Sequence, residues 1–217
     1  MSVQRLRVVF RKGGAAKHIS HLDLMRTWER ALRRAEVPLA YSRGFNPRPK
    51  LTFASALPVG FVGRSEMLDV FLERRVELQD AVSRLRAQLP CGVELRNATE
   101  VALALPSLPS QLAAAEYEVT IHSDETLAEL QLRLRRLMET ESVVRSRERP
   151  NGVRTYDLRP LIHELSVARQ QGETTVLRMR LQANAQGTGR ADEVLSALGL
   201  FSNVRSIERA RLVLKPS

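Results

Sequence analysis

The chain has 217 residues, of which 43% are hydrophobic and 27% charged, and this ordinary globular composition excludes an intrinsically disordered protein. No run of 18 apolar residues is present, which excludes a membrane-spanning helix, and a single cysteine excludes an internal disulfide and a chain-borne iron–sulfur cluster. The net charge is +10, and residues 1–50 hold twelve Lys or Arg against three Asp or Glu. Such an asymmetry predicts an anionic partner, although a basic surface that only aids solubility is the alternative.

The first half of the chain shows the pattern of a mixed α+β unit. Residues 5–11 alternate charged and apolar side chains, which predicts a half-buried strand that ends at the glycines of 13–14. The other expected elements are a helix over 21–35, a short extended piece over 39–41, a loop over 42–50, strands over 51–55 and 66–73, a helix over 76–89 and a strand over 92–103.

The helix over 21–35 has clear end signals. Ser20 is a good N-cap, and Asp23 stands at the third helical position, where a carboxylate complements both the cap and the helix dipole. The apolar residues recur at helical spacing and should face a core. The arginines fall largely outside that stripe, so the exposed surface of this helix is predicted to be cationic, through Arg26, Arg30, Arg33 and Arg34.

A linker is predicted over 105–115, where prolines, small residues and the absence of charge interrupt the pattern. The second half then carries expected strands over 117–121, 141–147, 153–158, 174–183 and 204–215, helices over 124–139 and 191–198, and a hairpin turn at Asn151-Gly152. Each half approximates the order βαββαβ. This predicts an α+β fold of two tandem ferredoxin-like domains with antiparallel sheets, over 1–104 and 116–217.

The segment 17–26 is the first candidate site. A helix N-terminus exposes amide donors that suit a phosphate, and Lys17, His18 and His21 lie beside this one. His21 could also act as a general acid or base near neutral pH. The structural alternative is that Ser20 and Asp23 only cap the helix, and for these two residues it is the favoured interpretation.

The loop over 42–50 is the second candidate site. Two prolines and a glycine fix its path, and Arg43, Arg48 and Lys50 alternate with Phe45 and Asn46. Cations beside an aromatic ring can hold a phosphate backbone and stack a base, as in the recognition of single-stranded RNA. The alternative is a rigid connection whose Phe45 is tucked into the core.

The second half offers weaker candidates. Strand alternation places Arg145, Arg147 and Arg149 on one face as a second basic strip. Tyr156, Asp157 and Arg159 could bind a ligand, although an internal Asp–Arg pair is the more usual explanation. The four histidines and one cysteine do not form the ligand set of a structural zinc site, so we expect neither a metal nor a cofactor.

Characteristic motifs stand at 10–13, 19–26, 29–35, 39–50, 57–60, 66–70 and 156–162. They resemble those of the radical-SAM-linked family of bacterial proteins. Its members are encoded beside, or fused to, a radical SAM enzyme, so the resemblance implies an accessory partner of such an enzyme. This chain lacks the Cys-x-x-x-Cys-x-x-Cys run of the enzyme itself. The layout is also similar to the repeat-processing endoribonucleases of CRISPR systems.

The sequence therefore favours a cytoplasmic, RNA-binding accessory protein that works with a separate radical SAM RNA-modifying enzyme and has no catalytic activity of its own. One alternative is a scaffold for that enzyme that never touches RNA. A second is a metal-independent endoribonuclease that uses His21 or His18, assisted by Tyr41 or a nearby lysine. The expected RNA contacts are Arg11, Lys12, Lys17, His18, His21, Arg26, Arg43, Phe45, Arg48 and Lys50.

Overall fold

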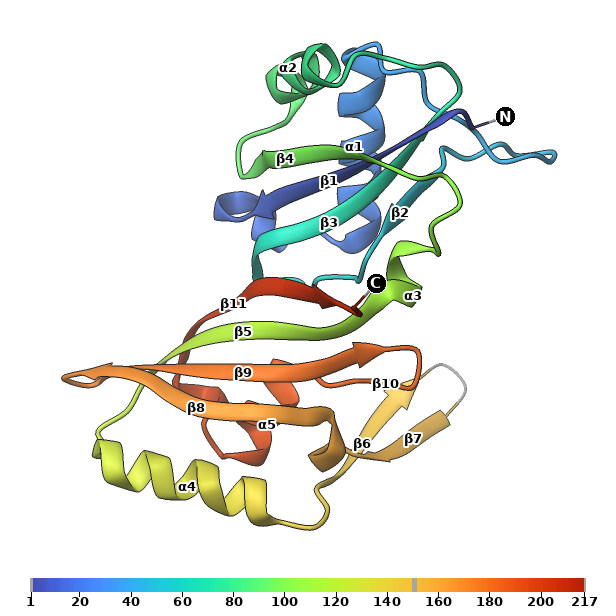
Figure 1. Ribbon diagram of the computed structural model, residues 1–217. Coiled ribbons are helices and arrows are strands. Elements are labelled where there is room, and N and C mark those ends of the chain that lie inside the picture. The colour runs from blue at the N-terminus through green and yellow to red at the C-terminus, as the bar shows by residue number, and fades with distance from the viewer. Residues whose placement is uncertain (1, 150–151, 217) are drawn as a thin grey trace. The chain divides into compact units, whose positions relative to one another are not determined.

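The computed structural model describes residues 2–149 and 152–216, and it confirms the mixed α+β class (Figure 1). The chain divides into two compact units, Met1–Leu112 and Ala113–Ser217. The described residues contain five α-helices and mostly antiparallel strands. None of these helices has the length and apolar character needed to cross a lipid bilayer.

The first unit follows the predicted order, with modest changes at the element ends. The helix expected over 21–35 ends one residue earlier, and the strand expected over 66–73 begins four residues earlier. Its elements are β1 (Gln4–Lys12), a 3-10 turn (Gly14–His18), α1 (His21–Arg34), β2 (Leu51–Phe53), β3 (Val62–Leu72), α2 (Leu78–Gln88), β4 (Val93–Val101) and α3 (Leu108–Gln111).

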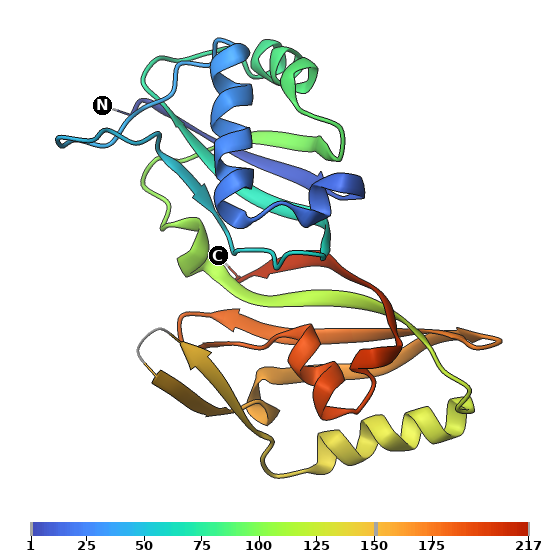
Figure 2. The same ribbon diagram turned by 180° about the vertical axis from the view of Figure 1, so that it is seen from behind.

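The strands of the first unit lie in the order β4-β1-β3-β2. Each neighbouring pair is antiparallel, and the register pairs Val8 of β1 with Leu68 of β3 and with Ala98 of β4. Helices α1 and α2 cover the same face of these strands, as the two opposite views show (Figures 1 and 2).

Strand alternation builds the core of the first unit. Leu6, Val8 and Phe10 of β1 point toward the helices and are at most 5% exposed. Trp28 of α1 is fully buried and meets the Phe10 ring edge-on, with ring centroids 4.9 Å apart. The intervening residues of β1, including Arg5 and Arg7, therefore lie on the opposite face of the sheet.

The segment expected to be a linker, residues 105–115, has regular structure instead. It contains α3 and the beginning of β5 (Leu112–His122). The buried Arg5 guanidinium donates to the carbonyl oxygens of Leu105 and Pro106 at 2.6 and 2.9 Å, and this ties the segment to β1. Composition alone indicated a linker because the anchoring residue lies about a hundred positions away in the chain.

The second unit keeps the predicted helices and adds elements that the sequence did not reveal. Asn151 of the expected hairpin turn lies outside the described residues. The elements that follow β5 are α4 (Leu127–Glu139), β6 (Val144–Arg149), β7 (Gly152–Asp157), a 3-10 turn (Arg159–Leu161), β8 (Ile162–Gln171), β9 (Thr174–Asn184), β10 (Gly187–Thr188), α5 (Ala191–Ala197), a 3-10 turn (Phe201–Asn203) and β11 (Val204–Leu214).

Strand β8 was missed in the sequence, and its pairing explains why. It runs antiparallel to β9, with register shifts between Ile162 and Glu164 and between Val167 and Arg169. Each shift moves the following side chains to the other face, so the two-residue period is lost. The strands of this unit lie in the order β11-β5-β9, with β8 and β10 both paired to β9, and β6 and β7 form a separate two-stranded sheet.

Candidate nucleic-acid interface

The loop over 42–50 is a narrow excursion closed at its base. The Lys50 amide donates to the Ala40 carbonyl at 2.8 Å, and the Ser42 amide donates to the Arg48 carbonyl at 2.8 Å. The Arg48 amide in turn donates to the Ser42 hydroxyl at 2.9 Å. Gly44 has a φ of 132°, a backbone conformation that favours glycine. These contacts hold the ends of the loop and leave residues 43–47 at its tip.

Phe45 stands at this tip and is 99% exposed, which contradicts the alternative of a ring tucked into the core. Arg43, Arg48 and Lys50 are exposed as well. Within the described residues, no carboxylate forms an ion pair with any of these three cations. The loop therefore presents an unburied aromatic ring among uncompensated positive charges.

Helix α1 carries a row of arginines spaced four residues apart. Arg26, Arg30 and Arg34 are exposed, and this spacing places them along one face of the helix. Arg26 pairs with Asp23 at 3.3 Å, whereas Arg30 and Arg34 have no carboxylate partner among the residues described. We call Arg26, Arg30 and Arg34 the arginine row.

Arg33 connects the end of α1 to the loop. Its guanidinium donates to the Tyr41 hydroxyl at 3.2 Å and lies over the Tyr41 ring, 6.0 Å from the centroid. It also pairs with Glu29 at 2.7 Å. These contacts hold Arg33 and Tyr41 within the fold, so neither residue belongs to the candidate contact surface.

At the other end of α1, Ser20 and Asp23 act as a cap. The Asp23 amide donates to the Ser20 oxygen at 3.1 Å, and the Ser20 hydroxyl donates to the Asp23 carboxylate at 2.7 Å. The hydrogen bond from Ser20, together with the charge of Arg26, lowers the pKa of Asp23 below its ordinary value. This geometry is that of the structural interpretation.

His21 is half-buried at the edge of an aromatic cluster. Its ring meets the Phe53 ring edge-on with centroids 5.2 Å apart, and Phe53 in turn packs against Phe10. Lys17 is half-buried, and its carbonyl accepts the Gly60 amide at 2.8 Å, while His18 is exposed. A packed His21 ring fits a structural role better than that of a proton shuttle.

Two of the expected RNA contacts lie elsewhere. Lys12 is fully buried because it shares the strand face of Phe10, and its ammonium donates to the Ile19 carbonyl at 3.0 Å. Arg11 lies on the opposite face of the sheet and pairs with Glu94 at 3.1 Å. Lys12 therefore leaves the candidate surface, and Arg11 is separated from the rest of it.

The remaining candidates form an elongated strip and not a single cluster. Helix α1 has fourteen residues, and at about 1.5 Å per residue it spans roughly 21 Å. Lys17 and His18 precede its first turn, and the loop follows its last turn. The arginine row lies between these two ends. We call the loop cations, Phe45 and the arginine row together the basic strip.

In the second half, Asp157 and Arg159 close the base of the β6–β7 hairpin. The Asp157 carboxylate accepts the amides of Val143 and Arg159 at 2.8 and 2.9 Å, and these bonds lower the pKa of Asp157. The Arg159 guanidinium donates to the Met138 carbonyl at the end of α4. Asp157 and Arg159 thus have structural roles at the base of the hairpin.

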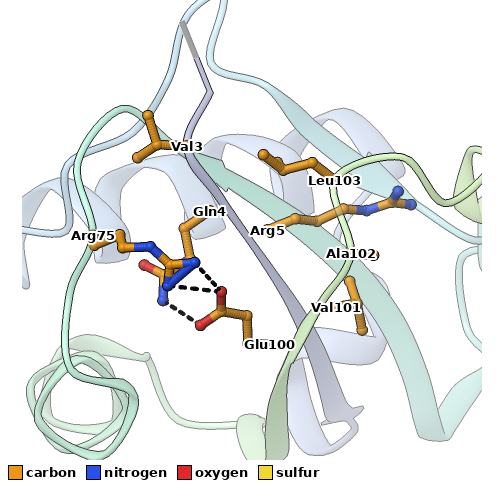
Figure 3. A pocket seen from close by; sticks show the side chains of 8 residues that line it. All are labelled: Val3, Gln4, Arg5, Arg75, Glu100, Val101, Ala102 and Leu103. Atoms are coloured by element: carbon orange, nitrogen blue, oxygen red, sulfur yellow. Dashed lines mark hydrogen bonds and ion pairs between the residues drawn. The ribbon is translucent and has the colours of Figure 1, made fainter.

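A pocket of about 270 Å³ lies where β1 begins and β4 ends (Figure 3). Its Glu100 carboxylate accepts Gln4 Nε2 at 2.8 Å and both terminal nitrogens of Arg75 at 3.0 and 3.1 Å. The Arg5 guanidinium points away from this group in Figure 3. Because its polar groups bind one another, we assign the pocket no ligand.

Among residues 2–149 and 152–216, no three His, Cys, Asp or Glu side chains are grouped so that they could hold a metal ion. Two further basic features of the surface are not among the contacts expected from the sequence. Arg30 and Arg34 were left out of the expected contacts although their i, i+4 spacing was readable. Arg154 was not linked to Arg147, because a cross-strand pair follows only from the hairpin register.

Comparisons with known proteins give one family and a fold likeness. The family model described as "Uncharacterized protein conserved in bacteria (DUF2344)" matches residues 5–191. No curated protein matches the chain.

Three solved structures resemble the fold at low sequence identity. A Cbf5-Nop10-Gar1 complex matches with a TM-score of 0.53 at 12% identity, over 95% of this chain and 48% of that chain. An archaeal box H/ACA sRNP Nop10-Cbf5 complex gives 0.47 at 14%, over 95% and 47%. An H/ACA RNP bound to a substrate RNA containing 2'-deoxyuridine gives 0.49 at 12%, over 96% and 47%. This chain spans about half the length of the chains it resembles.

Proposed function

For this chain, which belongs to the bacterial family DUF2344 as the match over residues 5–191 shows, we propose a function argued from its own surface. The protein is an RNA-binding accessory protein that works with a separate radical SAM RNA-modifying enzyme. The observation that carries the RNA-binding part is Phe45, 99% exposed among uncompensated cations.

The Phe45 ring is already exposed, so a base can stack on it without first displacing other groups of the protein. Base–aromatic stacking contributes about 1–3 kcal/mol per base, and it requires a base that is not already paired. Lys and Arg beside the ring neutralise phosphates and release counterions. The basic strip combines both devices, and this combination suits a single strand better than a duplex.

The accessory role rests on different grounds. The resemblance to radical-SAM-linked proteins supplies the enzyme, and the single cysteine of this chain leaves the three-cysteine cluster to that enzyme. We assign the RNA contacts to the basic strip and to Lys17 and His18, which precede the first turn of α1. The likeness to the Cbf5-Nop10-Gar1 complex concerns the fold alone and assigns no residue.

We also infer that each unit is a ferredoxin-like repeat. The order β4-β1-β3-β2 of the first unit and the order β11-β5-β9-β8 of the second support this, since the strands occupy corresponding positions. The β6–β7 hairpin is then an insertion between α4 and β8.

The test reverses the three loop cations in the variant Arg43→Glu, Arg48→Glu, Lys50→Glu. We expect the affinity for a single-stranded RNA to fall strongly, and the slope of log affinity against log salt to decrease by about 2, from about 0.7 for each lost phosphate contact. A second variant, Phe45→Ser, should lose roughly 5- to 150-fold in affinity with the salt slope unchanged, because stacking releases no counterions.

The matched control places the same three reversals on exposed arginines elsewhere, at Arg74, Arg86 and Arg135. It changes the net charge equally and leaves the strip intact, so it should retain most of the affinity. Equal losses in both triple variants would refute a local site. If the wild-type protein binds no RNA but co-purifies with the radical SAM enzyme at high salt, the scaffold alternative holds. Shortening of the RNA in EDTA, abolished by His21→Ala, would establish the ribonuclease.

A further inference from the structure

The β6–β7 hairpin is a second cationic surface, in the unit Ala113–Ser217. It forms a two-stranded sheet that is not paired with the other strands of its unit. Both views show it beyond the end of α4, beside the sheet formed by β5, β8 and β9 (Figures 1 and 2). A two-stranded ribbon of this kind has little stability of its own.

The register of the hairpin brings two arginines face to face. Arg147 of β6 pairs directly with Arg154 of β7, and Arg145 pairs with Tyr156. Since side chains alternate along a strand and directly paired residues share a face, these four lie on one side. Ser146 pairs with Thr155 on the other side, where their hydroxyls lie 3.3 Å apart.

The charges at the base of the hairpin are balanced, but those farther out are not. Arg145 pairs with Glu193 at 3.2 Å, and Arg190 pairs with Asp192. Arg147 and Arg154 are both exposed, and neither has a carboxylate partner in the described parts of the chain. Like charges directly opposite each other destabilise a strand pair. Arg147 and Arg154 therefore repel each other on the outer part of the hairpin. An anionic ligand bound between them would relieve this repulsion.

Tyr156 adds a hydrogen-bond donor beside these charges. Its side chain is half-buried, and burial, followed by the charge of Glu193, raises the pKa of its hydroxyl. The hydroxyl therefore stays protonated at neutral pH and can donate to a phosphate oxygen.

We propose that the hairpin face formed by Arg147, Arg154 and Tyr156 is a phosphate-backbone contact for RNA. This proposal rests on the proposed function for its partner, and it adds a second binding element in the other unit. Two opposed guanidinium groups can each donate two parallel hydrogen bonds to a phosphate group, which makes them contacts for a backbone and not for a base sequence.

The experiment compares two double variants that lower the net charge by the same two units. Arg147→Gln with Arg154→Gln removes the arginine pair, while Arg135→Gln with Arg169→Gln removes two exposed arginines elsewhere in the same unit. We expect the arginine variant to lower the salt slope of binding to a single-stranded RNA by about 1.4, and its affinity by roughly tenfold or more at 0.1 M salt. The control variant should change the slope little.

Thermal unfolding separates a binding role from a structural one. Removing a repulsive pair should leave the midpoint unchanged or raise it, whereas loss of a structural contact would lower it. An arginine variant that binds RNA like the wild type would overturn the inference. Equal losses of affinity in both double variants would overturn the inference as well, because the net positive charge of the protein would then explain them. If the wild-type protein binds no RNA, the proposed function fails first.

Discussion

The Asp69 carboxylate is fully buried on β3 and accepts hydrogen bonds from two arginines of β1. Arg5 is 1% exposed, and Arg7 contacts both carboxylate oxygens at 2.9 and 3.1 Å. A buried carboxylate is tolerable only because these partners replace the lost water. The charged residues of β1 that look like a solvated strand face thus form an internal ion-pair network.

We expect Asp69→Asn to lower the free energy of unfolding by about 3–5 kcal/mol, since it leaves the buried Arg5 and the mostly buried Arg7 guanidinium groups without their anion. The measurement is chemical denaturation followed by circular dichroism. The control is Asp80→Asn, which breaks the exposed pair with Arg84 and should cost at most about 1 kcal/mol. Similar losses for the two variants would contradict a special role for Asp69.

At the scale of an element, the base of the β6–β7 hairpin depends on the charge of Asp157. Its folded-state pKa is lowered by two backbone amides, so its stabilising effect is present above the unfolded pKa of about 4 and is lost as the pH falls through the folded value.

We therefore expect Asp157→Asn to unfold at a lower temperature than the wild type at pH 7, and to lose less of its stability between pH 5 and pH 2. Thermal unfolding across this pH range gives both quantities. An identical pH dependence in the two proteins would show that this carboxylate does not contribute. Exposed carboxylates such as Glu148, on the outer part of β6, serve as controls that should leave the profile unchanged.

The sequence predicted some elements well because their signals are local. Ser20 and the apolar spacing of α1 depend only on neighbours within a few residues, and so does the loop with Gly44. Strand β8 escaped because two bulges remove its period. The burial of Lys12 and the direct pairing of Arg147 with Arg154 were not predicted from the sequence, because strand pairing decides both. The exposed cations of the site were thus predictable, whereas their grouping was not.

At the scale of the whole molecule, the chain divides into two compact units, and the hydrophobic core of the first is drawn from that unit alone. Leu32 of α1 and Leu134 of α4 are 2% and 3% exposed, and they lie in the first and the second unit respectively. Replacing either by alanine should cost about 2–5 kcal/mol.

We expect each substitution to accelerate amide hydrogen exchange mainly within its own unit, since exchange follows the stability of the local cooperative segment. Hydrogen exchange of the full chain, resolved by peptide mass, measures this distribution. A uniform acceleration over both units with either variant would mean that the chain unfolds as one cooperative body.

The contacts of Arg5 set an order of events during synthesis. Its guanidinium reaches Asp69 and the carbonyl groups of Leu105 and Pro106, which the ribosome adds about a hundred residues after Arg5 itself. Until those residues have emerged, these two hydrogen bonds of the Arg5 guanidinium have no protein acceptor. Helices α1 and α2 and the four strands of the first unit therefore cannot complete the contacts of Arg5 by themselves, and these contacts form only after the segment that composition marked as a linker has been synthesised.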